Sequence, residues 1–470
     1  MKDAPDQITP PKVSRNRGTE QGGEVRARWA WAEERVWTTR MLEALERGIK
    51  GRKWFCLIDK VSAEATLQRA WEGVRSNGGS AGVDRVTVQR FEKDCQSRLL
   101  VVKEHLLART YRPEPVRRVW IEKLGGGERP LGIPTVRDRV VQNALRMVIE
   151  PIFEKEFAAH SYGFRPGRGC KDALRRVDAL LRTGNVWVVD ADLKSYFDTI
   201  PHERLMQLVE EHIADGGVLS LLRSFLKQGV MEQMRHVEAG ENGTPQGAVI
   251  SPLLANIYLN PLDHHMAEQG YEMVRYADDF VVMCRDQASA QQALAIIQQW
   301  VREAGLRLHP EKTRVVDASQ PGGFDFLGYH FERGRKWPRK KSVQKLRETV
   351  RAITPRSSGQ ALGRTIQRLN RVLKGWYGYF KHSVAHVMEE TDRWVRQRVR
   401  GILRRRAKRR GRVRLNDRSR YPNAYLAALG LFSLKKAHGA EVQSRRRRHS
   451  PTGEPDAGNP PVRFGGRGGE

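Results

Sequence analysis

The sequence contains few cysteines and no long apolar run. Its four cysteines, among 470 residues, lie far apart and form no Cys-x-x-Cys pair. This spacing excludes a disulfide framework and a zinc ribbon, because both need cysteines at short, paired spacings. No apolar stretch is long enough to span a bilayer, and residues 1–23 lack the apolar core of a signal peptide. We therefore predict a protein of the reducing cytoplasm that has no membrane partner.

Acidic residues are also scarce relative to basic ones. The chain has 54 Asp and Glu against 84 Lys and Arg, which gives a net charge of +30 and a pI near 10.4. An excess of this size favours a polyanionic partner, most simply nucleic acid. The alternative is a basic surface that binds nothing, and the clustering of the basic residues argues against it.

Composition and periodicity divide the chain into five segments. The two ends are polar and rich in Pro, Gly and charge, so they are predicted to be disordered. Between them, a helical stretch precedes a mixture of strands and helices, and a second helical stretch follows. The boundaries are residues 1–25, 26–110, 111–335, 336–435 and 436–470. In the first helical stretch the apolar spacing predicts one helix each over residues 24–46, 61–74 and 88–107.

Two adjacent aspartates interrupt an apolar stretch. The apolar arms 273–276 and 280–284 flank Asp278 and Asp279, which is typical of a β-hairpin with a polar turn. Aspartates at such a position usually serve only to make the turn. A second pattern favours a functional interpretation, because the apolar run of residues 186–189 ends in Asp190-Ala191-Asp192.

Two strands that both end in aspartate can place their carboxylates at one edge of a sheet. Clustered carboxylate oxygens suit Mg²⁺, which binds through a few carboxylates and substrate phosphates. Two such ions can activate an attacking hydroxyl and stabilise the leaving oxygen of a phosphoryl transfer. The pattern therefore predicts nucleotide polymerisation at Asp192, Asp278 and Asp279.

Two loops combine glycine with basic residues. Lys123 and Arg129 flank the turn 125–127, and Arg165 and Arg168 lie in the loop 161–169. Arginines, backbone amides and an aromatic ring can together hold a sugar-phosphate strand. The alternative for both loops is a solvated charged face.

The stretch 243–256 begins with glycines and ends in a predicted helix. Its glycines allow the backbone to approach a base pair closely, with Gln246 beside them. Ser251 followed by Pro252 predicts a helix start with Ser251 as the cap. Farther along, Asp286 is the predicted cap of another helix, and residues 324–331 are predicted to form a strand.

The last helical segment carries a dense block of arginine. Residues 396–420 contain thirteen Lys or Arg and one acid, Asp417, and the block includes Arg404, Arg405 and Arg406. A charge block is usually solvated. Here the arginines share predicted helices with aromatic and apolar residues, which favours an RNA-binding face.

Taken in order, these blocks resemble those of bacterial group II intron reverse transcriptases, also called maturases. The resemblance runs from about residue 40 to about residue 430, and it is carried by Arg129–Pro134, Asp138–Gln142, Ser161–Gly169, Asp190–Ile200, Gly243–Asn256, Tyr276–Asp279, Gly305–Lys312 and Phe326–Tyr329. It implies an α+β fold. Residues 111–335 would form the fingers and palm of a right-hand polymerase, with a small antiparallel sheet. Residues 336–435 would form an all-helical thumb and maturase domain with a basic DNA-binding region.

The resemblance also assigns roles to individual residues. Asp192, Asp278 and Asp279 would be catalytic and hold two Mg²⁺ ions, which Mn²⁺ can replace, with the backbone carbonyl of Leu193 as a further ligand. The implied nucleotide-binding residues are Lys123 and Arg129 on the triphosphate, Phe197 beneath the sugar, Gln246 near the nascent base pair, and Lys312. The implied RNA-binding residues are Arg165, Arg168, Arg404, Arg405 and Arg406.

The implied activity is RNA-directed DNA synthesis together with assistance to intron splicing and mobility. Its partners would be group II intron RNA, an RNA template with a DNA primer, dNTPs and target DNA, and a dimer is left open. No cysteine follows Cys284, so the paired cysteines of the HNH endonuclease found in many relatives are missing and that domain is expected to be absent. Two alternatives remain: a non-enzymatic RNA-binding splicing cofactor, and a host-adopted reverse transcriptase in DNA repair or defence.

Overall fold

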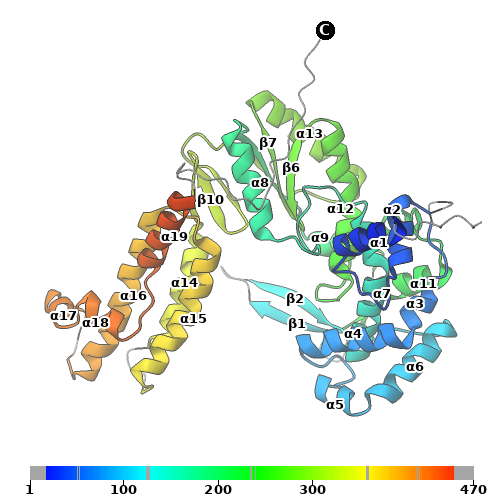
Figure 1. Ribbon diagram of the computed structural model, residues 1–470, viewed down its shortest axis with the longest axis horizontal. Coiled ribbons are helices and arrows are strands. Elements are labelled where there is room, and N and C mark those ends of the chain that lie inside the picture. The colour runs from blue at the N-terminus through cyan, green and yellow to red at the C-terminus, as the bar shows by residue number, and fades with distance from the viewer. Residues whose placement is uncertain are drawn as a thin grey trace, which may run out of the picture. The chain divides into compact units, whose positions relative to one another are not determined.

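The structure is a computed structural model that describes residues 17–49, 51, 53–122, 127–232, 235–238, 240–355, 359–409, 411 and 413–448. The chain divides into two compact units, Met1–Gly334 and Arg335–Glu470 (Figure 1). The division falls beside residue 336, where the sequence predicts that mixed structure gives way to helices. Each unit has its own helix packing, with α4 against α7 in the first and α16 against α19 in the second.

Helices form the N-terminal part of the first unit. They are α1 (Arg17–Arg28), α2 (Thr39–Arg47), α3 (Ile58–Ser62), α4 (Glu64–Asn77), α5 (Val88–Lys93) and α6 (Cys95–Leu107). Each of the three predicted helices is therefore interrupted. Between α1 and α2 the Thr38 hydroxyl accepts from the Met41 amide at 3.4 Å, and such a cap starts a new helix rather than continuing the old one. The predicted disordered start is also wrong in part, because residues 17–25 belong to α1, while residues 1–16 lie outside the described chain.

A four-stranded sheet comes next, with the strand order β2-β1-β4-β5. Its members are β1 (Val116–Glu122), β2 (Glu128–Ile133), β4 (Val230–Glu232) and β5 (Arg235–Val237). The strands β1 and β2 form an antiparallel hairpin, as predicted, and β1 pairs in parallel with β4. Helix α7 (Val136–Glu154) follows the hairpin and is largely buried, so it joins this sheet to the core of the unit.

A second four-stranded sheet has the order β6-β7-β3-β8, and all its pairs are antiparallel. Its members are β3 (Trp187–Asp192), β6 (Glu272–Tyr276), β7 (Asp279–Cys284) and β8 (Arg314–Asp317). Helix α13 (Gln287–Glu303) packs on β3, β7 and β8, while α8 (Cys170–Arg182) and α12 (Ser251–Glu268) pack on β6 (Figure 1). The fold is therefore α+β, as predicted, with one small antiparallel sheet and one small mixed sheet.

The remaining elements of the first unit are α9 (Tyr196–Thr199), α10 (His202–Glu210), α11 (Gly216–Leu226), β9 (Phe324–Phe326) and β10 (Tyr329–Glu332). Two further predictions about the first unit are wrong. The predicted strand 324–331 is a hairpin, because Leu327 and Gly328 both take positive φ and reverse the chain. Ser251 does not cap α12, since its hydroxyl donates to the Pro245 carbonyl at 2.9 Å. Asp286 does cap α13, accepting from the Ser289 amide at 2.8 Å.

The second unit is almost entirely helical. Its elements are β11 (Arg335–Pro338), α14 (Lys340–Ile353), α15 (Leu362–Phe380), α16 (Ala385–Arg406), α17 (Leu415–Arg420), α18 (Asn423–Ala428) and α19 (Leu434–Arg448). The predicted disordered tail is wrong for residues 436–448, which belong to α19, and residues 449–470 lie outside the described chain. Asp392 of α16 starts α19 by accepting from the amides of Leu434 and Lys435 at 2.9 and 3.1 Å.

Candidate active site

The three predicted catalytic aspartates come together at one edge of the second sheet. Asp192 is the last residue of β3, and it lies directly opposite Asp279, the first residue of β7. Asp278 sits in the turn before Asp279, between β6 and β7. Residues nearly ninety positions apart in the sequence therefore meet because β3 and β7 are neighbouring antiparallel strands. The predicted convergence is present in the structure.

The turn that carries Asp278 has an unusual backbone. Ala277 takes a φ of +60°, a left-handed conformation that is uncommon for a residue with a Cβ. It is also almost fully buried, with 7% of its surface exposed. The turn is therefore held in place by its surroundings rather than by its own conformational preference.

Lys312 lies beside Asp192 in this structure. Its Nζ is 2.8 Å from Asp192 Oδ2, and both side chains are partly exposed. The segment before it runs next to the end of β3, where the His309 amide donates to the Asp192 carbonyl at 2.7 Å and the Lys194 amide donates to Arg307 at 2.8 Å. The ammonium of Lys312 thus neutralises part of the negative charge at this edge of the sheet.

The carboxylates do not form a closed metal cage by themselves. Within the described chain no three His, Cys, Asp or Glu side chains are grouped closely enough to hold an ion unaided. This agrees with the chemistry of Mg²⁺, which uses one or two carboxylates and completes its shell with waters and substrate phosphates. Carboxylates at a strand edge therefore fit a metal that arrives with a nucleotide.

Asp190 lies two residues before Asp192 on β3, so the two side chains share one face of the strand. Burial raises the pKa of Asp190 to about 6, although Arg314 Nε lies 3.3 Å from its carboxylate. Asp190 was not among the predicted site residues. Its alternation with Asp192 was the signal available in the sequence.

Gln246 and Phe197 lie next to the same region. Gln246 Nε2 donates to both oxygens of Asp198 at 3.0 and 3.1 Å, and Phe197 is partly buried against the core. The Gly132 amide donates to the Gln246 carbonyl at 2.7 Å, which ties this loop to β2. A hollow of about 370 Å³ lies here, lined by residues of β1, β2 and the 240–246 loop. The hollow is large enough for part of a nucleotide.

The two predicted triphosphate residues are only partly described. Lys123 lies outside the described residues. Arg129 belongs to β2, where it lies opposite Ile121 of β1. The strands β1 and β2 pair as an antiparallel hairpin.

The prediction for Arg165 is wrong, and the one for Arg168 stays a prediction. Arg165 is 6% exposed, and its guanidinium donates to the Glu154 carboxylate and to the carbonyls of Ala158 and Ser161. It therefore folds the loop 158–165 instead of facing RNA. Arg168 is partly exposed and donates to the Ala159 carbonyl at 2.5 Å.

The three arginines near the end of α16 separate in the same way. Arg404 is 9% exposed and its Nη1 lies 2.8 Å from Asp417 Oδ2, so the prediction of RNA binding is wrong for this residue. Arg405 and Arg406 are exposed. The guanidinium of Arg406 also donates to the Gln360 carbonyl.

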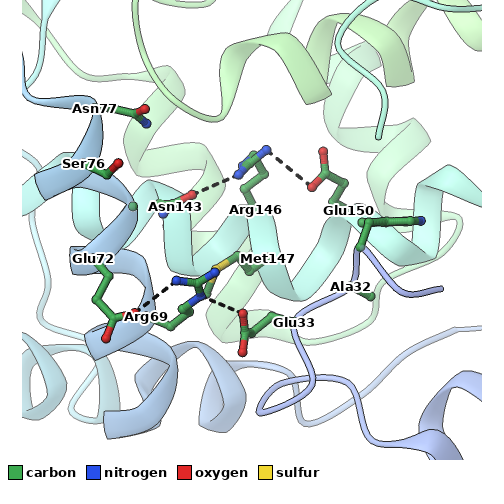
Figure 2. A pocket seen from close by; sticks show the side chains of 12 residues that line it. Ala32, Glu33, Arg69, Glu72, Ser76, Asn77, Asn143, Arg146, Met147 and Glu150 are labelled. Carbon is green, nitrogen blue, oxygen red and sulfur yellow. Dashed lines mark hydrogen bonds and ion pairs between the residues drawn. The ribbon is translucent and has the colours of Figure 1, made fainter. Parts of the chain in front are cut away.

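A second hollow, of about 340 Å³, lies between α4, α7 and the segment before α2, and contains none of the predicted site residues (Figure 2). Arg69 lies between Glu33 and Glu72, at 2.7 and 3.1 Å. Arg146 lies 3.5 Å from Glu150 (Figure 2). Because both guanidinium groups already face carboxylates, this hollow is poorly suited to binding a phosphate.

Sequence reasoning missed a buried polar cluster directly behind the turn. Its members are Arg275, Asp263 and Asn256, which are 0%, 6% and 1% exposed. Arg275 Nε donates to Asp263 at 2.8 Å, and Arg275 Nη1 donates to Asn256 at 2.9 Å. Asn256 and Asp263 are seven residues apart on α12, a spacing that places two polar groups on one buried helix face. That spacing was the signal available in the sequence.

Comparison with known proteins agrees with these features. Residues 121–331 match the reverse transcriptase (RNA-dependent DNA polymerase) family, and residues 343–421 match the maturase-specific domain of group II introns. A reverse transcriptase domain implies dependence on a divalent metal ion, and the maturase-specific domain implies binding of intron RNA. Within the described residues, no helix has both the length and the apolar character needed to cross a membrane.

Three relatives illustrate the extent of the similarity. Protein YkfC of Escherichia coli (strain K12) is 36% identical over 293 residues, which are 54% of this chain and 76% of that protein. The group II intron-encoded protein LtrA of Lactococcus lactis subsp. cremoris is 39% identical over 197 residues, 41% of this chain and 32% of LtrA. A 91 kDa protein in the cob intron of Schizosaccharomyces pombe is 38% identical over 196 residues, 41% of this chain and 24% of that protein.

The chain thus spans about three quarters of YkfC but a third or less of the other two relatives. Its two family matches follow each other in the order expected for a polymerase and a maturase domain. The chain belongs to the group II intron reverse transcriptases, a family of RNA-dependent DNA polymerases that carry a maturase-specific domain.

Proposed function

We propose that this chain copies RNA into DNA at Asp192, Asp278 and Asp279. The observation that carries the proposal is the register of β3 and β7, in which Asp192 lies opposite Asp279. In the reaction the primer 3′-hydroxyl attacks the α-phosphate of a dNTP, a new phosphodiester bond forms, and pyrophosphate leaves. The contribution of the protein is to position the reactants and to neutralise charge.

The three carboxylates would hold two Mg²⁺ ions, with the Leu193 carbonyl as a further oxygen ligand and Mn²⁺ as a substitute. The residues on either side of Leu193 are held by backbone hydrogen bonds. The Lys194 amide donates to the Arg307 carbonyl, and the Asp192 carbonyl accepts from the His309 amide. When bound, such ions supply activation of the attacking hydroxyl and stabilisation of the leaving oxygen. Asp190, with its pKa raised to about 6 by burial, is about half ionised at that pH and mostly ionised at pH 7.

Lys312 would exchange its partner during nucleotide binding. Its ammonium lies 2.8 Å from Asp192 Oδ2 in this structure. A flexible ammonium is well suited to moving between a carboxylate and a phosphate, since it donates from a point rather than from a rigid fork. We infer that Lys312 turns to the triphosphate when a nucleotide arrives.

The remaining nucleotide contacts would come from the first sheet and the loop beside it. Phe197 would lie beneath the sugar, and Gln246 would face the nascent base pair from the hollow lined by the 240–246 loop. Lys123 and Arg129 would bind the triphosphate.

The second unit would hold the folded intron RNA in its splicing-competent form and would also contact the target DNA. Arg405 and Arg406 are exposed at the end of α16 and are the arginines of this block best placed to reach phosphates. In the first unit, the partly exposed Arg168 would likewise contact RNA phosphates. Phosphate contacts of this kind make binding strongly dependent on salt.

Primer extension on an RNA template tests the polymerase assignment. We expect Asp278→Ala and Asp279→Ala each to lower the extension rate by on the order of 10³-fold, because a lost charge stabiliser acts directly on the transition state. Intron RNA binding should stay within about twofold, since that role is assigned to the basic residues.

The matched control is Asp286→Asn, which alters an aspartate beyond the opposite end of β7 that caps α13 and should leave extension unchanged. Loss of RNA binding together with activity in the Asp278 and Asp279 variants would mean that these residues are structural. A wild-type protein that binds intron RNA but extends no primer would favour the non-enzymatic splicing cofactor.

A further inference from the structure

Arg275 is the last residue but one of β6, and its side chain points back into the protein behind the turn. Its guanidinium is fully buried and is shared among three acceptors. Nε donates to Asp263 Oδ1 at 2.8 Å, while Nη1 donates to Asn256 Oδ1 at 2.9 Å and to the Ala277 carbonyl at 2.9 Å. One side chain therefore joins α12 directly to the turn that precedes Asp278.

Asn256 extends this link to a second chain segment. Its Nδ2 donates to the Gly163 carbonyl at 2.8 Å. Gly163 lies against the turn so closely that a Cβ there would be 2.2 Å from the Ala277 amide nitrogen. The backbone of the same segment pairs with β6, since the Tyr162 amide donates to the Arg275 carbonyl at 2.8 Å. The turn is thus enclosed by α12 on one side and by the 160–163 segment on the other.

The need for such support follows from the backbone of the turn. Ala277 has a φ of +60°, and a strained residue keeps that conformation only where its surroundings impose it. The carbonyl of this residue is the one that Arg275 holds. If the bond were lost, the turn would be able to relax, and Asp278 and Asp279 would move with it.

Stability alone does not account for the buried charges. A buried ion pair is often no more stabilising than apolar residues of similar volume. Burial opposes the charge of Arg275, yet Asp263, Tyr196 and Asp278 together raise the pKa of Arg275 above its usual value. Apolar residues of similar volume would fill this space at a lower cost in free energy. The charged cluster instead fixes the geometry of the turn through its hydrogen bonds.

We propose that Arg275 is a positioning residue for the reaction: with Asp263 and Asn256, it fixes the Ala277 turn so that Asp278 and Asp279 stay beside Asp192. This inference rests on the proposed metal-dependent polymerase function. It assigns to α12 and the 160–163 segment the task of setting how tightly the carboxylates bind divalent ions.

Two variants test the proposal in different ways. Arg275→Lys keeps a positive charge near Asp263, but an ammonium cannot span Asp263, Asn256 and Ala277 together. Gly163→Ala leaves every charge in place and pushes on the turn through the new Cβ. The matched control is Asp215→Asn, which changes a buried carboxylate that accepts from the amides of Leu57, Ile58, Gly217 and Val218, outside the cluster.

Two measurements are made on the full-length chain, well below each variant's melting temperature. Primer extension is followed against Mg²⁺ concentration, and Mn²⁺ binding is followed by electron paramagnetic resonance with primer-template bound. For Arg275→Lys and Gly163→Ala we expect the half-saturating metal concentration to rise about tenfold and kcat to fall by about 10²-fold, the scale of an ångström-sized displacement. KM for primer-template should stay within about twofold of the wild type. Asp215→Asn should lower the melting temperature and leave metal binding unchanged.

The result that overturns the inference is a pair of folded variants with wild-type Mn²⁺ affinity and Mg²⁺ dependence. Variants that melt earlier but bind metal normally would give Arg275 a purely structural role, which also overturns it. Failure of the proposed function is a different result, since the wild-type chain itself would then bind no Mn²⁺ with primer-template and extend no primer.

Discussion

Each unit contains a buried arginine–aspartate pair, and the two pairs have different surroundings. In the first unit Arg275 lies 2.8 Å from Asp263 and also donates to the carbonyl that precedes Asp278. In the second, Arg404 lies 2.8 Å from Asp417, which also accepts from the Arg414 amide at 2.8 Å. The first pair supports a turn that carries candidate catalytic groups, whereas the second closes the connection between α16 and α17. The same interaction therefore serves function in one unit and folding in the other.

Breaking the second pair should lower the stability of the second unit and leave the turn before Asp278 in place. Arg404→Ala leaves the buried Asp417 carboxylate without its guanidinium, which costs about 3 kcal/mol in the free energy of unfolding. Hydrogen exchange should then speed up in α16 and α17 and stay unchanged in β6 and β7. Faster exchange in β6 and β7 would contradict the separation of the two roles.

A third arginine–aspartate pair, Arg314 with Asp190, sharpens the comparison. Although Arg314 lies beside its carboxylate, the pKa of Asp190 is raised to about 6, chiefly by burial. The folded-state pKa lies above the unfolded value of about 3.9. The contribution of Asp190 to the free energy of unfolding is therefore fully present below about pH 3.9 and is lost as the pH rises through 6. Between pH 5 and pH 7 the loss is about 1 kcal/mol.

Urea unfolding at pH 5, 6 and 7 checks this expectation. Asp190→Asn cannot titrate, so its free energy of unfolding should lack that decrease of about 1 kcal/mol. An equal decrease in the wild type and the variant would assign the pH dependence to other groups.

The smallest expected effect is a change in the salt dependence of RNA binding. It should differ between the neighbouring residues Arg404 and Arg405. Arg405 is exposed and Arg404 is buried. Arg405→Ala should reduce the slope of log affinity for intron RNA against log salt by about one, without changing the melting temperature. Arg404→Ala should show the opposite pattern, with lower stability and an unchanged slope below the melting transition. Equal slope changes in both variants would mean that Arg404 reaches the RNA.

Local sequence patterns correctly predicted the edge of the second sheet, where the three aspartates lie. The apolar arms around Asp278 and Asp279 and the run ending in Asp192 appear as β6, β7 and β3. Strand alternation and turn chemistry act over a few residues, so they can be read without knowing what packs against them. The interruption between α1 and α2 was missed because a cap such as Thr38 competes with helix continuation on nearly equal terms.

The burial of individual arginines was beyond the reach of such patterns. Arg165, Arg404 and Arg405 all lie in basic stretches, yet only Arg405 is exposed. A guanidinium looks the same in the sequence whether its partner is water, phosphate or a carboxylate distant in the chain. Glu154 and Asp417, the carboxylates that bind the two buried arginines, became visible only with the fold.

The sequence by itself determined the class of this protein: an ordered series of motifs, a large excess of positive charge, and three aspartates at the ends of apolar strands. The tertiary structure decided which of these charges face solvent and what holds the aspartates in place. The reason is physical, because strand and turn preferences are local, whereas the contacts of Arg275 with Asp263, Asn256 and Ala277 exist only after α12 has packed against β6.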